Sequence, residues 1–179
     1  MRILPQFAMM SLLAGSPVLA LAATDGSATV NYSGTLIALP CTVQPGMDDL
    51  YIEMGEVFPQ NLYAYTRTLG TEFSFVLEDC DTSLGTTITA TFSGANVNAQ
   101  GLLAFDSTSS ASGAFIGLET LSGRALPIDG TTVYSMPIAD GDMTLKFRAY
   151  VQGDSEAIAA KSITPGAYWA TLTYALSYE

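Results

Sequence analysis

The sequence has 179 residues, of which 49% are hydrophobic and 13% are charged. This length and composition suffice for one domain with a buried core and argue against disorder. Six basic and seventeen acidic residues give a net charge of −11. A field of that sign repels nucleic-acid phosphates and anionic lipid headgroups, so it argues against such partners and favours basic ones. The 16 glycines and the lack of a long amphipathic helical pattern favour an all-β class.

The first 22 residues are predicted to be a secretory signal peptide. Arg2 precedes an apolar run over residues 7–21, and Ala20-Leu21-Ala22 is a small-x-small cleavage site. Two serines and a proline interrupt this run, which is shorter than the roughly 20 apolar residues that a membrane-spanning helix needs. The mature chain is therefore expected to begin at Ala23, to be exported, and not to insert into a membrane.

The sequence contains two cysteines, Cys41 and Cys80, and no histidine. In an oxidising compartment, a lone pair of cysteines is expected to form a disulfide. A closed loop of roughly 40 residues would stabilise the fold by about 4 kcal/mol in the chain-entropy model. Two cysteines alone do not make a zinc site, and their spacing is far from a C-x-x-C redox motif, so no metal and no cofactor are predicted.

Short strand-like runs recur along the mature chain, separated by clusters of Asp, Asn, Ser, Thr and Gly that favour turns. Their apolar–polar alternation and their spacing predict a β-sandwich, with "FDSTSSASG" at 105–113 as a surface loop and no second domain. The predicted strands cover residues 28–43, 50–57, 71–80, 86–94, 102–105, 114–121, 131–138, 143–151 and 167–179.

The closing run "AYWATLTYALSYE", residues 167–179, alternates over its whole length, and one of its faces is apolar throughout. That face consists of Tyr168, Ala170, Leu172, Tyr174, Leu176 and Tyr178. An apolar edge strand without charge or proline is a template for pairing with another chain. The neighbour of this strand therefore comes either from elsewhere in the chain or from another molecule. The leading run is shaped to be such a strand, because its alternate residues are Ala28, Val30, Tyr32, Gly34 and Leu36.

Several runs, taken in order, resemble the subunits of chaperone–usher pili, of which the type 1 and P pilus pilins are the best-known members. These runs are "GTLIALPCTV", "IEMGEV", "FSFVLEDCD", "FIGLETLSGRALPI", "LKFRAYV" and "ITPGAYWATLTYALSYE". The resemblance covers nearly all of the mature chain. In that family a glycine stands fourteenth from the C-terminus and an aromatic residue second from it, and Gly166 and Tyr178 occupy these positions here.

The resemblance implies an incomplete immunoglobulin-like β-sandwich that lacks its last strand and is completed by a donor strand from another chain. It implies that residues 23–36 are the donor-strand extension, that 37–179 are the pilin domain and that Cys41–Cys80 is the pilin disulfide. Gly34 would pass a crowded part of the groove, since a strand-interior glycine marks close approach of another backbone; a bulge or turn is the alternative. The implied groove edge for chaperone and subunits is Gly166, Tyr168, Leu172, Tyr174, Leu176 and Tyr178.

The same resemblance implies a structural fimbrial subunit, not an enzyme, that polymerises by donor-strand exchange into an adhesive surface pilus. Its partners would be a periplasmic pilus chaperone, an outer-membrane usher and neighbouring pilin subunits. Two other functions are compatible with parts of the sequence. Acidic clusters such as Asp140-Gly-Asp142 could form a paired-carboxylate or calcium site, although loop acids are more often a solvated surface. A self-contained secreted β-sandwich could instead bind a host glycan or protein through exposed aromatic residues.

Overall fold

The computed structural model describes residues 28–179, and the chain divides into two units at Leu36–Ile37. In the leading unit, residues 28–36 contain no helix or strand. Their large apolar side chains are exposed, with exposed fractions of 66% for Val30, 91% for Tyr32 and 102% for Leu36. The predicted signal peptide and the first residues of the predicted extension lie outside the described residues.

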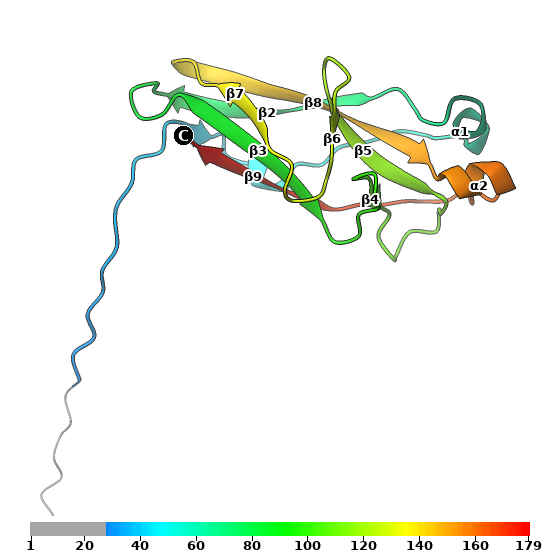
Figure 1. Ribbon diagram of the computed structural model, residues 1–179, viewed down its shortest axis with the longest axis horizontal. Coiled ribbons are helices and arrows are strands. Elements are labelled where there is room, and N and C mark those ends of the chain that lie inside the picture. The colour runs from blue at the N-terminus through cyan, green and yellow to red at the C-terminus, as the bar shows by residue number, and fades with distance from the viewer. Residues whose placement is uncertain (1–27) are drawn as a thin grey trace, which may run out of the picture. The chain divides into compact units, whose positions relative to one another are not determined.

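Residues 37–179 form two antiparallel β-sheets (Figure 1). The larger sheet has the strand order β1-β2-β8-β5-β4, with β6 paired to β5, and the smaller has the order β7-β3-β9. The strands are β1 (Thr42–Val43), β2 (Thr71–Cys80), β3 (Thr87–Gly94), β4 (Leu103–Ala104), β5 (Ala114–Thr120), β6 (Ala125–Leu126), β7 (Tyr134–Pro137), β8 (Gly141–Gly153) and β9 (Leu172–Tyr178). The predicted all-β class is confirmed.

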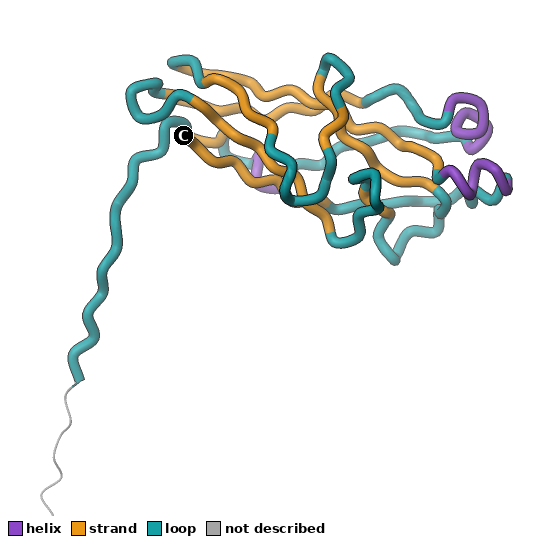
Figure 2. Tube along the Cα trace, in the orientation of Figure 1, coloured by secondary structure: helices purple, strands orange, loops and turns teal. Residues whose placement is uncertain are grey.

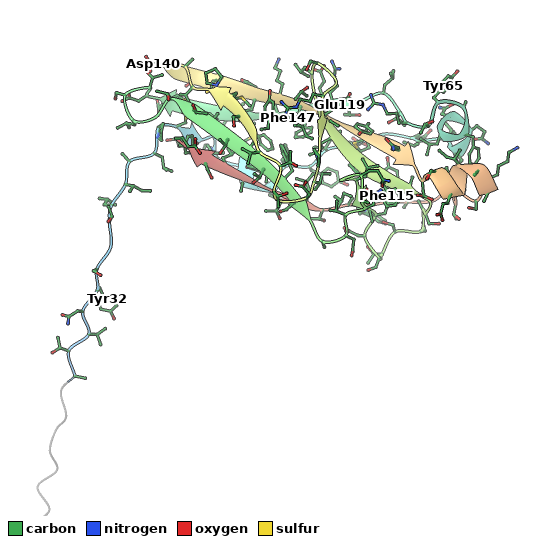
Figure 3. All side chains as sticks on the ribbon, in the orientation of Figure 1. Tyr32, Tyr65, Phe115, Glu119, Asp140 and Phe147 are labelled. Carbon is green, nitrogen blue, oxygen red and sulfur yellow. A yellow bond between two sulfur atoms is a disulfide. The ribbon has the colours of Figure 1, made fainter. Side chains whose placement is uncertain are left out.

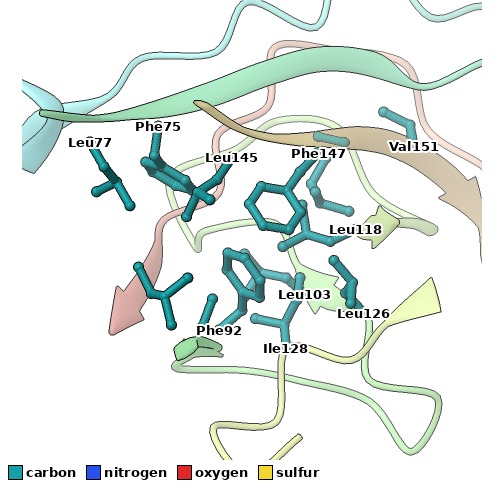
Figure 4. Close-up of a cluster of buried hydrophobic side chains, with 14 of the residues drawn as sticks. Phe75, Leu77, Phe92, Leu103, Leu118, Leu126, Ile128, Leu145, Phe147 and Val151 are labelled. Carbon is teal, nitrogen blue, oxygen red and sulfur yellow. The ribbon is translucent and has the colours of Figure 1, made fainter. Parts of the chain in front are cut away.

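The hydrophobic core lies between the two sheets (Figure 4). From the middle of the larger sheet, β8 contributes Leu145, Phe147 and Val151, which are at most 1% exposed. Phe147 meets Phe92 of β3 edge to face, with ring centroids 5.3 Å apart, so the two sheets contact each other directly. Burial of a side chain of this size contributes about 1.5–3 kcal/mol, which makes this interface the main source of stability.

Two of the predicted strands are wrong over most or all of their length. Of the run 28–43, only Thr42–Val43 is a strand. Residues 50–57 form no strand, although Leu50, Ile52 and Met54 are half-buried at every second position, as in a strand. A strand is defined by the hydrogen bonds to its neighbour as well as by its sequence. No described residue supplies that ladder to residues 28–41 or 50–57.

The last strand is shorter than predicted, because residues 167–171 bond to a loop instead of to β3. Within this stretch, the N–H of Asp106 donates to the carbonyl oxygen of Trp169 at 2.8 Å, and the N–H of Ala111 donates to that of Ala167 at 3.1 Å. The loop 106–111 thus continues the role of β3 beyond the end of that strand. β8 extends two residues further at each end than predicted, and β6 was not predicted.

Three short helices were not predicted: η1 (Met47–Asp49), α1 (Pro59–Tyr65) and α2 (Ser155–Ala160). Helices of one or two turns are too short to show a helical period. The cap of α2 is nevertheless readable in the sequence, because the Asp154 carboxylate accepts hydrogen bonds from the N–H groups of Glu156 and Ala157 at 3.1 and 3.0 Å. The two α-helices lie at the same end of the sandwich (Figure 2).

Candidate functional site: an open groove beside the last strand

The last strand, β9, is paired along one edge only. Its register with β3 runs from Ile88–Tyr178 to Gly94–Leu172. In residues 37–179, no strand pairs with the other edge, which faces the segment 43–57. Segments 43–57 and 165–178 therefore form the two walls of an open groove, called the groove below. The sandwich has one empty strand position.

The side chain of Tyr174 connects the two walls of the groove. Its hydroxyl donates to the backbone carbonyl oxygen of Met47 on the opposite wall, at 2.7 Å. The Tyr174 ring packs on Phe75 of β2, with centroids 4.2 Å apart, and so forms part of the groove floor.

Further contacts join the segments just beyond the walls, near both ends of the groove. The Tyr178 hydroxyl donates to the carbonyl oxygen of Cys41 at 3.4 Å. Near the helices, the N–H of Ile163 donates to the Tyr63 hydroxyl at 3.1 Å. The disulfide between Cys41 and Cys80 is present, so this prediction is confirmed. It holds the start of one wall against the end of β2.

The groove opens into two hollows. The first, called the helix-end hollow, is partly open to solvent. Its lining is mainly apolar and includes Val57, Pro59, Leu62, Phe105, Ile163 and Tyr168. The second hollow is lined by Val43, Gln44, Pro45, Gly46 and Tyr174.

Tyr168 places a hydroxyl in the apolar helix-end hollow. Its ring stacks on Phe105, with centroids 4.7 Å apart. Its hydroxyl oxygen is buried and has no hydrogen-bond partner among residues 28–179. Burial raises the pKa of Tyr168 above the ordinary value of 10.0, because the phenolate is less well solvated there than in water, and the pKa of Tyr178 is raised for the same reason.

Gly166, also in the helix-end hollow, is needed for close packing. A Cβ at this position would overlap the Oγ of Ser110 and lie 2.9 Å from the backbone nitrogen of Ala111. The Ser110 hydroxyl instead accepts a hydrogen bond from the N–H of Ala167 at 3.0 Å. Glycine thus lets the loop 106–111 bond to the groove wall.

The structure brings the predicted groove residues together on one wall. In this set, Gly166 lines the helix-end hollow, and the others are half-buried and pack against the core: Tyr168, Leu172, Tyr174, Leu176 and Tyr178. The predicted donor residues lie in the other unit, where they are exposed: Ala28, Val30, Tyr32 (labelled in Figure 3), Gly34 and Leu36. Their donor role stays a prediction.

Sequence reasoning found the opposite wall only in part. Val57 belongs to the apolar run at 50–57 that was predicted, whereas Leu62 and Ile163 were not singled out. Leu62 could have been found, since Pro59 starts a helix that turns this residue inward. Ile163 follows helix α2, which ends at Lys161 in the left-handed conformation, with φ at 53°. Because lysine rarely adopts this conformation, the sequence does not predict the end of the helix or the position of Ile163.

The acidic clusters serve loop structure. The carboxylate of Asp140, at the tip of a loop (Figure 3), accepts a hydrogen bond from the N–H of Thr82 at 2.8 Å, and that of Asp142 accepts one from Asp79 at 3.3 Å. Within residues 28–179, no three acidic or cysteine side chains are grouped as metal ligands. In the same residues, no helix has the length and apolar character needed to cross a membrane.

Comparisons with known proteins agree with one another, because each finds fimbrial proteins. Residues 30–179 match the family model of fimbrial proteins. The Fimbria A protein of Serratia marcescens is 32% identical over 169 residues, which are 92% of this chain and 92% of that protein. The Major MR/P fimbria protein of Proteus mirabilis is 30% identical over 172 residues, which are 95% of this chain and 93% of that protein. Both relatives are fimbria proteins.

Solved structures agree on the fold. The P pilus rod subunit PapA covers 79% of this chain and all of its own length, with a TM-score of 0.67 and 23% identity. A subunit of a chaperone–usher pilus covers 89% of this chain, with a TM-score of 0.68 and 23% identity. A two-sheet sandwich with one empty strand position is the incomplete immunoglobulin-like fold of chaperone–usher pilins. The chain belongs to the fimbrial protein family and is a fimbrial subunit of this class.

Proposed function

We propose that this subunit polymerises by donor-strand exchange, in which the groove of one copy receives the extension 23–36 of another subunit. The observation that supports this most directly is the open edge of β9, which pairs with β3 on one side and with no strand of residues 37–179 on the other. A strand in that place would gain backbone hydrogen bonds along β9 and bury alternate side chains, which is the mode of recognition called β-augmentation.

The extension has the chemistry that such a strand needs. Its alternate residues Val30, Tyr32 and Leu36 are large, and all three are exposed in the leading unit. Burial of each in a groove would contribute about 1.5–3 kcal/mol, and the backbone ladder would add to this. The exposed row of apolar side chains otherwise has no use in a secreted subunit, so a partner groove explains it.

Before assembly the same groove needs a temporary occupant, because an apolar edge strand left open leads to aggregation. We assign this role to a periplasmic chaperone and the exchange step to an outer-membrane usher. The predicted signal peptide 1–22 would direct the chain to the periplasm, and the product would be an adhesive fimbrium on the cell surface. The net charge of −11 fits a chaperone with a basic binding face.

The alternative of a self-contained binding module is less well supported. Such a module should have a completed sandwich and be stable as a monomer. The half-buried inward face of β9, including Leu172 and Leu176, is what a completed sandwich would cover.

The proposed function can be tested by moving the donor strand within one chain. One protein is the mature chain 23–179, and the other lacks 23–36 at the start and carries this segment after Glu179 on a short Gly/Ser linker. The relocated strand should raise the midpoint of thermal unfolding by more than 10 °C and give a monomer, because it fills the empty strand position. A matched control carries the same relocated segment with Val30 and Leu36 replaced by serine, and it should gain little.

The result also separates the possible functions. A mature chain that is already stable and monomeric, with no gain from the relocated strand, would refute donor-strand exchange and favour the binding module. An unstable chain that the strand does not rescue would show that the groove takes a strand of different sequence, which would refute assembly of this subunit with itself.

A further inference from the structure

The groove wall 43–57 lacks a strand ladder over most of its length, so other contacts have to anchor it. Within this wall, only Val43 at its start belongs to a strand. There, the disulfide between Cys41 and Cys80 ties the chain to the end of β2. At its other end the wall leads through Phe58 into α1, so whatever fixes α1 also fixes this end of the wall. The contacts that fix α1 therefore bear on the shape of the groove.

The chain directly after α1 is bonded to β8. The N–H of Thr68 donates to the carbonyl oxygen of Val151 at 2.9 Å, and the N–H of Val151 donates to the Thr68 hydroxyl at 3.0 Å. The carbonyl oxygen of Thr66 accepts from the N–H of Gly153 at 2.9 Å. Thr66 has a φ of 69°, which β-branched residues rarely adopt, and such a backbone persists only where its surroundings enforce it. The stretch 66–68 is thus held in a conformation that the chain alone would not choose.

Arg67, in the middle of this stretch, connects it to β5 and β8. Its Nη1 donates to the Oε2 of Glu119 (labelled in Figure 3) at 2.8 Å, and its guanidinium lies 4.3 Å from the centroid of the Tyr150 ring. Glu119 is only 4% exposed. The ring of Tyr150 lies against Gly117, where a Cβ would overlap it. The residues Arg67, Glu119 and Tyr150 are called the Arg67 cluster below.

A second arginine–glutamate pair shows what sets this one apart. Arg148 of β8 donates to Glu72 of β2 at 3.1 Å, and the Glu72 side chain is 57% exposed, against 5% for that of Glu119. An exposed pair contributes little to stability, because water solvates both charges when they separate. A buried carboxylate without its partner is poorly solvated, so the loss of Arg67 should be costly and the loss of Arg148 should not.

α1 transmits this anchor to the groove. Its Leu62 is 2% exposed and lines the helix-end hollow, and the hydroxyl of its Tyr63 accepts from the N–H of Ile163, just before the second wall. The N–H of Thr66 donates to the carbonyl oxygen of Leu62 at 2.9 Å, so the residue before Arg67 closes the last turn of α1. A shift of Arg67 would therefore move side chains at the helix end of the groove.

We propose that Arg67 is a positioning residue of the groove, whose pair with Glu119 holds α1 and, through α1, the helix end of the wall 43–57. The Arg67 cluster is then the counterpart of the disulfide at the other end of this wall. A strand received between the two walls meets a wall that is already in place, so less ordering is needed when it binds. This last step rests on the proposed donor-strand exchange, whereas the anchoring of the wall does not.

The anchoring is tested by amide hydrogen exchange of the mature chain 23–179, followed by mass spectrometry. Arg67→Met keeps the apolar part of the side chain and removes the charge. It should speed exchange over residues 59–68 by about tenfold or more, through local opening, and leave β3 unchanged. Adding Glu119→Gln to Arg67→Met should recover part of the protection, since no buried charge is then left unpaired. Arg148→Met is the matched control and should change exchange less than about twofold.

The effect on strand binding is measured by calorimetry with a synthetic peptide of residues 23–36. The dissociation constant of this peptide should rise by about threefold or more for Arg67→Met, because the loosened wall has to be ordered when the peptide binds. For Arg148→Met it should stay unchanged.

Exchange that is unchanged, or that rises equally in β3, would overturn the proposal, since Arg67 would then be dispensable or would support only the fold as a whole. Absence of recovery with Glu119→Gln would overturn the role of the ion pair. Faster exchange with unchanged peptide affinity would overturn the link to the groove. A peptide that fails to bind even the original chain would refute donor-strand exchange instead, and the exchange of residues 59–68 would still decide whether Arg67 anchors the wall.

Discussion

β8 and β9 have the same apolar alternation in sequence but are buried to different extents. The inward residues of β8, such as Leu145 and Phe147, are at most 1% exposed, because this strand pairs with β2 along one edge and with β5 along the other. The inward residues of β9, such as Leu176 and Tyr178, are half-buried, because this strand pairs with β3 alone. The number of neighbours, and not the composition of the strand, decides how much of its apolar face is buried.

This difference separates two uses of apolar surface. The surface of β8 is used up by the folding of the subunit itself, since both of its neighbours belong to the same chain. Under the proposed function, the surface of β9 is partly retained for a partner, and its free edge offers backbone groups to the same partner. Substitutions in β8 should therefore damage folding, and substitutions in β9 should damage assembly.

The largest effect is expected in β8. Phe147→Ala should lower the free energy of unfolding by about 3–5 kcal/mol, because it removes a ring that packs against Phe75 and Phe92 and leaves a cavity. Denaturant unfolding followed by circular dichroism measures it. Thr144→Ala, on the exposed face of the same strand, is the control and should stay within about 0.5 kcal/mol of the original. A mild loss for Phe147→Ala would mean that the core is not closed around β8.

Changes in β9 should act on partners more than on folding. Leu176→Ser and Tyr178→Ser should each abolish co-purification with the chaperone while export continues, because both side chains face the groove. Their cost to the subunit's own unfolding free energy should be smaller than that of Phe147→Ala. Ser177→Ala, on the outer face of β9, should leave the complex intact. Normal recovery of the complex from the first two variants would count against the groove assignment.

The extension allows assembly to be changed without touching either strand. Gly34→Val should block polymerisation, because the added side chain would meet a crowded part of the groove, while the thermal unfolding of the subunit stays unchanged. Gel filtration and electron microscopy of the assembled material measure the first effect. Ser33→Ala, one residue away, should polymerise normally. Polymers that form unchanged with Gly34→Val would place the donor strand elsewhere.

The smallest effect is a dependence on alkaline pH. Because the pKa values of Tyr168 and Tyr178 are raised in the folded chain, the unfolded chain loses these protons first as the pH rises. The free energy of unfolding should be constant with respect to these groups below about pH 10 and should fall as the pH rises through the raised values. The free energy of unfolding is measured at several alkaline pH values for the original chain and for Tyr168→Phe. The difference between the two gives the part of the pH dependence that is due to Tyr168. A stability that rises in this range would contradict the burial of these phenols.

Much of the fold could be predicted, because alternation marks a strand wherever a neighbour exists to complete it. The runs at 71–80, 86–94 and 114–121 became strands with bounds close to those expected. The run at 50–57 has the same signal and is not a strand, since the described chain gives it no ladder. Helices as short as α1 and α2 have no visible helical period, and only the residues at their starts mark them in the sequence. These local signals could predict where each helix begins but not what it packs against.

The sequence by itself determined the alternation of β9, the pair Cys41 and Cys80, and the row of alternate residues in the extension, because each depends on residue type and spacing alone. Only the tertiary structure decided which edge of β9 stays open, that Tyr174 spans the groove to Met47, and that the Tyr168 hydroxyl is buried without a partner. These features depend on segments more than a hundred residues apart meeting across the sandwich, and no local pattern encodes such distances.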